Sequence, residues 1–287
     1  MAVRFIADSG CDILPAEAET MGIIHLPLKV IFGETEYRDA VDLSHREFYE
    51  RLVESDQLPT TCQVPPAEFA DAYEKVVSAG DTAVVVTVSG KLSGTYQSAV
   101  IASEDYEGKV FVVDSENVSL GHRILIQQGL RYRDAGFSAG QIAEKLEQDK
   151  KKIRVLALLD TLEYLKKGGR ISAATALAGS LLSIKPVVTV DEGAVAMAGK
   201  ARGSKQGNNL LRQLVEKSGG IDFDRPLCLA YSGLSDDLLR KYIEDSEELW
   251  HGHQECLQLA TVGCAIGTHA GPGAVAVAFF MNEEGAL

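Results

Sequence analysis

The feature that most constrains the fold is the run Thr82–Val88, in which nearly every residue is valine or another β-branched residue. A strand with one exposed face would alternate apolar and polar residues, so a continuous apolar run predicts a strand buried on both faces. Val3–Ala7 and Lys109–Val113 have the same character, and helical patterns such as Val118–Ala135 accompany them. Buried strands separated by helices indicate βαβ units, so we expect an α/β first half with a mostly parallel sheet.

Two helix starts in this half carry a capping box, in which a serine is followed three residues later by Glu or Gln. Ser44 with Glu47 is one, and Ser138 with Gln141 is the other. The second box lies inside Gly136–Gly140, which matches the GxSxG pattern of a nucleophile elbow. That elbow requires a strand before the serine, whereas helices flank it here, so Ser138 is predicted to be a helix cap.

The second half of the chain has a different rhythm, and the charged run Asp149–Lys152 is the predicted boundary. Residues 1–150 and 151–287 are therefore expected to form two domains. Two β-rich segments flank Asp191–Gly193, which predicts a hairpin, and Ser172–Ser183 has the pattern of a helix of small residues. Hairpin and helices together predict a C-terminal α/β domain of the α+β type, with a mixed or antiparallel sheet. The remaining predicted elements are strands at Ile24–Phe32, Ile153–Leu159, Arg225–Tyr231, Glu255–Thr261 and Ala274–Phe280, and helices at Ser93–Ser103, Thr161–Lys167, Ser204–Ser218 and Ser235–Trp250.

The composition excludes several classes of protein. The chain has 287 residues, a net charge of −13 at pH 7 and no basic stripe, so we expect no binding to nucleic acid or to anionic lipid surfaces. Its five cysteines include no CxxC pair, which argues against a disulfide framework and against a structural zinc site. No uncharged run reaches the roughly 20 residues of a membrane helix, and no signal peptide is expected. These features predict a soluble, cytoplasmic protein without a metal.

Three loops that leave the buried strands carry polar residues: Asp8-Ser9, Ser89–Thr95 and Asp114-Ser115. Ligands of open parallel sheets sit at the carboxyl ends of the strands, so these loops are candidates for binding. In the second loop Ser93 stands where a helix is expected to begin, and hydroxyl and backbone N–H groups there can converge on an anion. The alternative is that Ser93 only caps the helix.

A further candidate is the glycine-rich run Gly267–Gly273, which contains His269. Three glycines and a proline in seven residues predict an irregular loop, and a histidine held there could bind a carboxylate or move a proton. The alternative is a structural turn with an incidental histidine. Arg170 and Arg202 also lie beside glycines in short loops, where arginine suits phosphate or carboxylate recognition; the alternative is a solvated surface.

Many of these segments match one known family, and they do so in the same order along nearly the whole chain. The matching segments are Asp8-Ser9 with Asp12, Tyr37–Asp39 with Asp42-Leu43, Thr61–Gln63, Leu92–Tyr96, Val113–Ser115 with Ser119 and Gly121, Leu159–Ile171, Lys185-Pro186, Lys200–Gly203 and Gly267–Gly273. With these segments the chain resembles the DegV family, the fatty-acid-binding subunits of bacterial fatty acid kinase.

The resemblance implies a Rossmann-like N-terminal domain beside an α/β C-terminal domain, with a long-chain fatty acid held in an apolar tunnel between them. It implies that Thr61, Ser93 and His269, with Thr268 nearby, bind the carboxylate of that fatty acid. No cofactor is implied beyond the fatty acid itself, which would be a ligand.

The resemblance also implies a partner rather than catalysis by this chain alone. A separate ATP-using kinase would phosphorylate the bound acid to acyl-phosphate, and Arg170 and Arg202 would serve that step. The chain has neither a GxxxxGK[ST] nor a GxGxxG pattern, which fits a protein without a nucleotide loop of its own.

An alternative function remains open on the residues themselves. The chain could be a stand-alone hydrolase or phosphotransferase in which Asp8, Asp114 and His269 act as metal or acid–base groups. A regulatory module with a protein partner and no lipid is a third reading. The positions that depart from the family pattern are Cys62, Val64, Pro65, Gly90 and Arg123.

Overall fold

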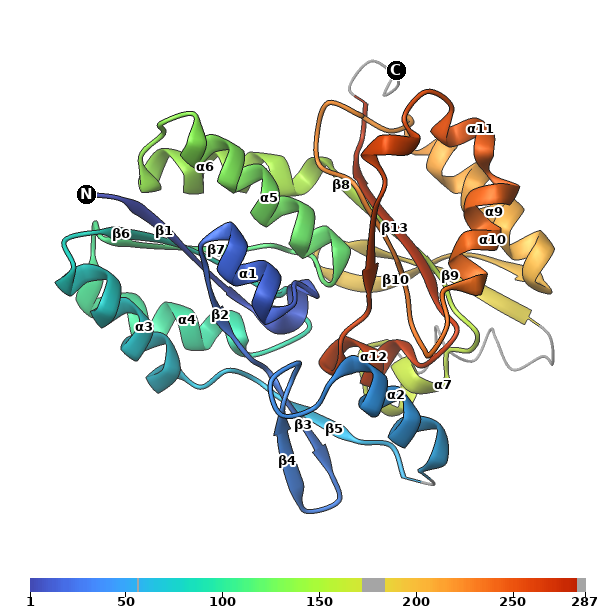
Figure 1. The fold of residues 1–287 in the computed structure, drawn as a ribbon, viewed down its shortest axis with the longest axis horizontal. Helices are drawn as coiled ribbons and strands as arrows, with labels where there is room; N and C mark the ends of the chain where they lie inside the picture. The colour runs from blue at the N-terminus through green and yellow to red at the C-terminus, as the bar shows by residue number, and fades with distance from the viewer. Residues whose placement is uncertain (56, 172–183, 283–287) are drawn as a thin grey trace.

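Three sheets and the helices that cover them make up the protein, as seen in a computed structural model that describes residues 1–55, 57–171 and 184–282 (Figure 1). The strands are β1 (Val3–Asp8), β2 (Ile23–Leu26), β3 (Lys29–Phe32), β4 (Thr35–Arg38), β5 (Thr60–Cys62), β6 (Thr82–Thr87), β7 (Val110–Asp114), β8 (Ile153–Leu158), β9 (Ile184–Asp191), β10 (Ala194–Arg202), β11 (Cys228–Tyr231), β12 (Gln258–Thr261) and β13 (Val275–Phe280). The α-helices are α1 (Pro15–Met21), α2 (His45–Glu54), α3 (Pro66–Ser78), α4 (Thr95–Ser103), α5 (Leu120–Asp134), α6 (Ala139–Asp149), α7 (Glu163–Lys167), α9 (Ser204–Lys217), α10 (Asp237–Asp245), α11 (Glu247–Trp250) and α12 (Cys264–Ala270).

The first half contains a four-stranded sheet with the order β2-β1-β6-β7, and all of its strand pairs are parallel. Every residue of β6 is buried, which confirms the strand predicted from its continuous apolar run. One face of the sheet packs with α1, α5 and α6, and the other packs with α3 and α4. The predicted α/β organisation with a parallel sheet is therefore confirmed.

The second half contains a six-stranded mixed sheet with the order β10-β9-β8-β13-β11-β12. Only β11 and β12 are parallel to each other, and the predicted hairpin is formed by the antiparallel pair β9 and β10. Its outer face packs against α9, α10 and Trp250. The mixed sheet agrees with the prediction for this half, and the predicted helix Ser172–Ser183 lies outside the described residues.

Two predicted elements are each split in the structure. The strand expected at Ile24–Phe32 is wrong as a single strand, because Pro27 has no N–H to donate and separates β2 from β3. β2 stays in the parallel sheet, whereas β3 is the centre of a separate antiparallel sheet with the order β4-β3-β5. The helix expected at Ser235–Trp250 is likewise divided into α10 and α11 at Ser246.

The glycine-rich run that was predicted to be an irregular loop is mostly helical. Residues Cys264–Ala270 form α12, and the helix ends at Gly271, which has a φ of 71°. Gly267 lies inside this helix, and a Cβ atom at this position would stand 2.6 Å from the Tyr49 hydroxyl. This glycine therefore permits close packing rather than a turn, and the expectation of a loop around His269 is wrong.

Helix α5 connects the two large sheets into one core. It runs between them in Figure 1, and its buried side chains belong to a hydrophobic cluster that contains residues of β1, β6, β8 and β13. Ten of its residues are buried, among them Ile124 and Leu125. The two halves therefore share apolar packing instead of meeting at a hydrated interface. Within the described residues, no helix has both the length and the apolar character needed to cross a membrane.

Replacing Ile124 with alanine tests the importance of this shared helix. Ile124 is fully buried, so Ile124→Ala is expected to lower the free energy of unfolding by about 2–5 kcal/mol. Ile101→Ala on α4 is the matched control, because Ile101 is 48% exposed and its loss should change the free energy by less than about 0.5 kcal/mol. Urea unfolding followed by circular dichroism measures both variants, and equal effects would contradict the shared core.

Candidate functional site

A cavity of about 370 Å³ lies between the loops of the parallel sheet and the inner face of the six-stranded sheet. This volume falls within the range of about 300–1,000 Å³ that small-molecule sites occupy. Most of its lining side chains are aliphatic. They are Leu28, Val88, Leu92, Val118, Val155, Ala157, Leu159, Leu165, Val188, Val190, Val195, Val262, Ala265, Ile266, Ala270, Ala274 and Ala276. On β8 and β13 the lining residues alternate with residues that pack under α9 and α10, as expected for strands.

The polar groups of the cavity include a bonded pair. Thr61 on β5 and His269 in the last turn of α12 line the cavity, and Thr61 Oγ1 lies 3.0 Å from His269 Nε2. These residues are far apart in the sequence, and β5 and α12 come together because α12 packs against β3 and β5. Gln63, which also lines the cavity, donates to the Ser98 hydroxyl at 2.8 Å. In the sequence, Gln63 stands out only as part of the matching segment Thr61–Gln63.

Ser93 lies in the loop after β6 and lines the same cavity. Its hydroxyl oxygen accepts the backbone N–H of Thr95 at 3.3 Å and lies 2.9 Å from the Thr95 hydroxyl. The alternative role predicted for Ser93 was to cap α4. The N-cap residue is Gly94, so Ser93 lies one residue before the cap position. The Ser93 hydroxyl is thus held at the start of α4, where backbone N–H groups also point outward.

Arg170 approaches His269 from the segment after α7. Its guanidinium donates to the backbone oxygens of Leu92 at 3.1 Å and of Gly168 at 2.7 Å, so it ties the two halves together at the cavity. Gly168 packs directly on the His269 ring, because a Cβ atom there would overlap Nδ1. Of the two glycines between Lys167 and Arg170, Gly168 is therefore required by the close approach of His269.

His269 is neutral at physiological pH. Burial lowers its pKa to about 4, and the nearby positive charge of Arg170 acts in the same direction. Its Nδ1 atom is buried and has no hydrogen-bond partner among the described residues. A neutral imidazole next to a threonine hydroxyl can exchange hydrogen bonds with a polar ligand group without first breaking an ion pair.

Two buried carboxylates hold the start of α12 and thereby position His269. Asp12 accepts the backbone N–H of Gly263 at 2.9 Å, and Asp39 accepts those of Cys264 and Ala265 at 3.0 and 3.2 Å. Both carboxylates belong to the first half, whereas α12 belongs to the second. Burial raises the pKa of Asp12 to about 7, against the hydrogen bonds from Ser119 and Gly263 that lower it.

Two predicted site residues lie away from the cavity lining. Thr268 is buried, and its hydroxyl donates to the backbone oxygen of Cys264 at 2.9 Å, one helical turn earlier. Arg202 is the last residue of β10 and is exposed. Arg170 lines the cavity, and Arg202 does not.

The three residues of the alternative function are not gathered at one place. Asp8 is completely buried, and its two oxygens accept the backbone N–H groups of Gly10 and Val88. Asp114 lines a second, more polar hollow that it shares with Lys91 and Lys150, among other residues. Neither aspartate lines the cavity that contains His269. Asp8 thus bonds the loops after β1 and β6. Asp114 accepts N–H groups in the loops after β6 and β7.

A family model described as "Uncharacterised protein, DegV family" matches residues 2–282. The chain belongs to the DegV family. A DegV domain-containing protein of Deinococcus radiodurans is 34% identical over 284 residues, which cover 97% of this chain and 98% of that protein. The family resemblance found in the sequence is thereby confirmed.

Solved structures of DegV proteins have the same fold. The structure of a fatty-acid-binding DegV family protein from Thermus thermophilus is 31% identical, with a TM-score of 0.87 over 98% of this chain and 100% of that one. A stearic-acid-binding protein from Eubacterium ventriosum is 27% identical, with a TM-score of 0.84 and 97% of each chain covered.

The positions identified from the sequence as departures from the family pattern fall in three places. Cys62 is an exposed residue at the cavity lining, Val64 is buried in the core, and Pro65 precedes α3. Gly90 donates its N–H to Asp114. Arg123 is buried, where it pairs with Glu17 at 2.6 Å and donates to the backbone oxygen of Asp12 at 3.0 Å. Arg123 therefore supports the loop that holds α12.

The depressed pKa of His269 predicts a specific dependence of stability on pH. Between pH 6.5 and pH 4 the unfolded chain binds a proton at this residue and the native protein does not, so stability is lost as the pH falls through this window. In His269→Gln this part of the loss should disappear. Urea unfolding of both proteins at pH 7 and pH 5 measures the difference, and carbon-13 NMR of labelled histidines locates the titration. A His269 signal that titrates near pH 6.5 would contradict the assignment.

Proposed function

We propose that this DegV protein is a carrier that binds one long-chain fatty acid, with the acyl chain in the aliphatic cavity and the carboxylate near Thr61, Ser93 and His269. The observation that carries the proposal is the combination of an aliphatic cavity with the Thr61–His269 pair. Two solved relatives that share the fold are named as fatty-acid-binding proteins. The ligand would lie between the proposed domains, residues 1–150 and 151–287.

The energetics of the cavity favour an acyl chain. Each CH₂ group of an acyl chain that is buried contributes about 0.8 kcal/mol to the free energy of binding. Contacts with the aliphatic lining therefore supply most of the affinity for the fatty acid. The head group is recognised by hydroxyl groups and a neutral imidazole, and Arg170 supplies a nearby positive charge. Because Arg170 is already bonded to two backbone oxygens, the carboxylate is held without a dedicated buried ion pair, which would carry a large desolvation cost. We assign Thr268 a supporting role, since its hydroxyl bonds within α12.

The carboxylate held in this way would be presented to a partner kinase that supplies ATP and forms the acyl-phosphate. The chain itself is proposed to be a binding subunit without its own nucleotide site, in keeping with the lack of a phosphate-loop pattern. Arg170 and Arg202 would face the partner or the transferred phosphoryl group, where an arginine stabilises the charge that develops during transfer. The exposure of Arg202 supports a role toward a partner rather than toward the acyl chain.

The first test of the carrier function measures lipid directly. Protein expressed in bacteria, denatured and extracted with organic solvent, should release nearly one equivalent of fatty acid by mass spectrometry.

Ser93→Ala removes a hydroxyl that bonds a charged head group, so affinity for added fatty acid should fall about tenfold or more. Ser78→Ala, at the exposed end of α3, is the control and should bind like the parent. Protein free of acyl mass that also fails to bind added fatty acid would refute the proposal.

A second test separates binding from phosphorylation. Arg202→Ala should leave fatty-acid affinity unchanged but sharply reduce acyl-phosphate formation when a cognate kinase and ATP are added, because the charge it stabilises develops only in the transfer step. Arg170→Ala should also reduce acyl-phosphate formation, and it should weaken fatty-acid binding as well, because Arg170 lines the cavity near the head group. Arg240→Ala, on the exposed side of α10 and paired with Asp236, is the control. Equal turnover in all three variants would remove the arginines from this step, and the chain alone with ATP should form no acyl-phosphate.

A further inference from the structure

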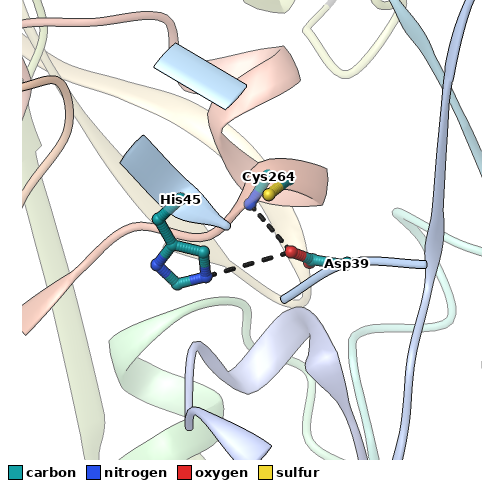
Figure 2. Close-up of side chains that lie close together, drawn as sticks. All are labelled: Asp39, His45 and Cys264. Atoms are coloured by element: carbon teal, nitrogen blue, oxygen red, sulfur yellow. Dashed lines mark hydrogen bonds and ion pairs between the residues drawn. The ribbon is translucent and has the colours of Figure 1, made fainter. Parts of the chain in front are cut away.

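A cluster of side chains that could bind a metal ion lies at the start of α12. Asp39, His45 and Cys264 each place one potential ligand atom there, and these atoms all lie within 4.8 Å of one another. Figure 2 shows the His45 ring and the Cys264 backbone nitrogen both directed at the Asp39 carboxylate. His45 Nε2 lies 3.9 Å from Asp39 Oδ1. The three residues come from three segments: the loop after β4, the first turn of α2 and the first turn of α12.

We propose that Asp39, His45 and Cys264 form a binding site for a thiophilic divalent cation, Zn²⁺ above all. Zn²⁺ takes Cys sulfur, His nitrogen and carboxylate oxygen as ligands in a tetrahedral arrangement. Its bonds of about 2.0–2.3 Å require ligand atoms closer together than the present separations, so small side-chain rotations would bring the three groups onto one ion.

The burial of the three groups suits a site for a single ion with one open position. Asp39 is 1% exposed and Cys264 is fully buried. The His45 side chain retains 11% exposure, so an ion can enter along this side and keep a water molecule as its fourth ligand. A buried carboxylate is costly unless a positive charge lies close to it. The ion pair that the structure gives Asp39 is the long contact of 3.9 Å with His45, so a bound cation would be favourable here.

The surroundings already orient the carboxylate in the manner of a metal ligand. Asp39 Oδ2 accepts the hydroxyl of Ser9 at 3.0 Å and the N–H of Ala265 at 3.2 Å. Oδ1 accepts the N–H of Cys264 at 3.0 Å, which leaves its second lone pair for the ion. Such outer hydrogen bonds hold the ligands of metal sites in place. The Cys264 thiol donates to the backbone oxygen of Leu43 at 3.5 Å. On binding, the sulfur forms a bond to the ion and the thiol proton is released to solvent.

An ion at this site would join α2 to the first turn of α12, and His269 lies in the last turn of that same short helix. The site is separate from the proposed fatty-acid site, and its existence does not depend on lipid binding. The absence of a CxxC pair argued against a structural zinc site only through spacing along the sequence. Ligands from three distant segments have no such spacing.

The test uses the full-length protein treated with a chelator and then titrated with Co²⁺ alone, followed by Zn²⁺ alone. We expect one equivalent of Co²⁺ per chain, with a thiolate-to-cobalt absorption band and the visible bands of a tetrahedral ion, and displacement of cobalt by Zn²⁺. Cys264→Ala should abolish the thiolate band. His45→Ala should keep that band and weaken the affinity at least about tenfold. Cys256→Ala and His253→Ala, both at exposed positions, are the controls and should behave like the parent.

The results of these titrations either support the metal site or overturn it. A thiolate band that persists in Cys264→Ala would overturn the site, as would uptake of less than one equivalent by the parent protein. If Cys264→Ala does not fold by circular dichroism, His45→Ala carries the test, since His45 is partly exposed at the start of α2. Unchanged cobalt affinity in His45→Ala would overturn the proposal. The Tm of the parent protein should also rise with Zn²⁺ concentration, and the Tm of His45→Ala should rise less.

Discussion

The interaction on which the rest of the structure depends is the capture of the α12 N-terminus by two buried carboxylates. The first N–H groups of a helix have no partner within the helix, and here Asp12 and Asp39 accept those of Gly263, Cys264 and Ala265. The helix dipole favours negative charge at this end, which offsets part of the cost of burying the carboxylates. Because α12 is only seven residues long, fixing its first turn also fixes His269 in its last turn.

The shared core around α5 adds a second constraint. Its side chains pack with strands of both large sheets, so the cavity between the sheets has rigid aliphatic walls. Separating the two halves would expose this core to water at a cost proportional to its apolar area. Exchange of the proposed fatty acid is therefore expected to use local movement at the rim of the cavity rather than a hinge between the halves. Arg170, which bridges to the backbone oxygen of Leu92, lies at such a point of contact.

Sequence reasoning succeeded where one local cause dominates and missed features that depend on distant partners. The apolar run of β6 and the capping boxes at Ser44 and Ser138 predicted their elements because burial and end capping act locally. The Gly267–Gly273 run did not, because Gly267 is explained by the Tyr49 hydroxyl of a distant helix. The family motifs named Thr61 and His269, but only the fold shows that their side chains are bonded.

The alternation of residues along the cavity strands has a consequence for how ligand preference evolves. Val155 and Ala157 on β8 line the cavity, whereas Leu156 and Leu158 pack on the opposite face, beneath α9. An exchange between alanine and valine at a lining position changes the cavity by two methyl groups, while Leu156 and Leu158 keep their packing on the opposite face. For the proposed carrier, partly buried lining positions such as Ala157 can therefore tune the acyl length that fits, whereas Val155 is also part of the core shared with α5.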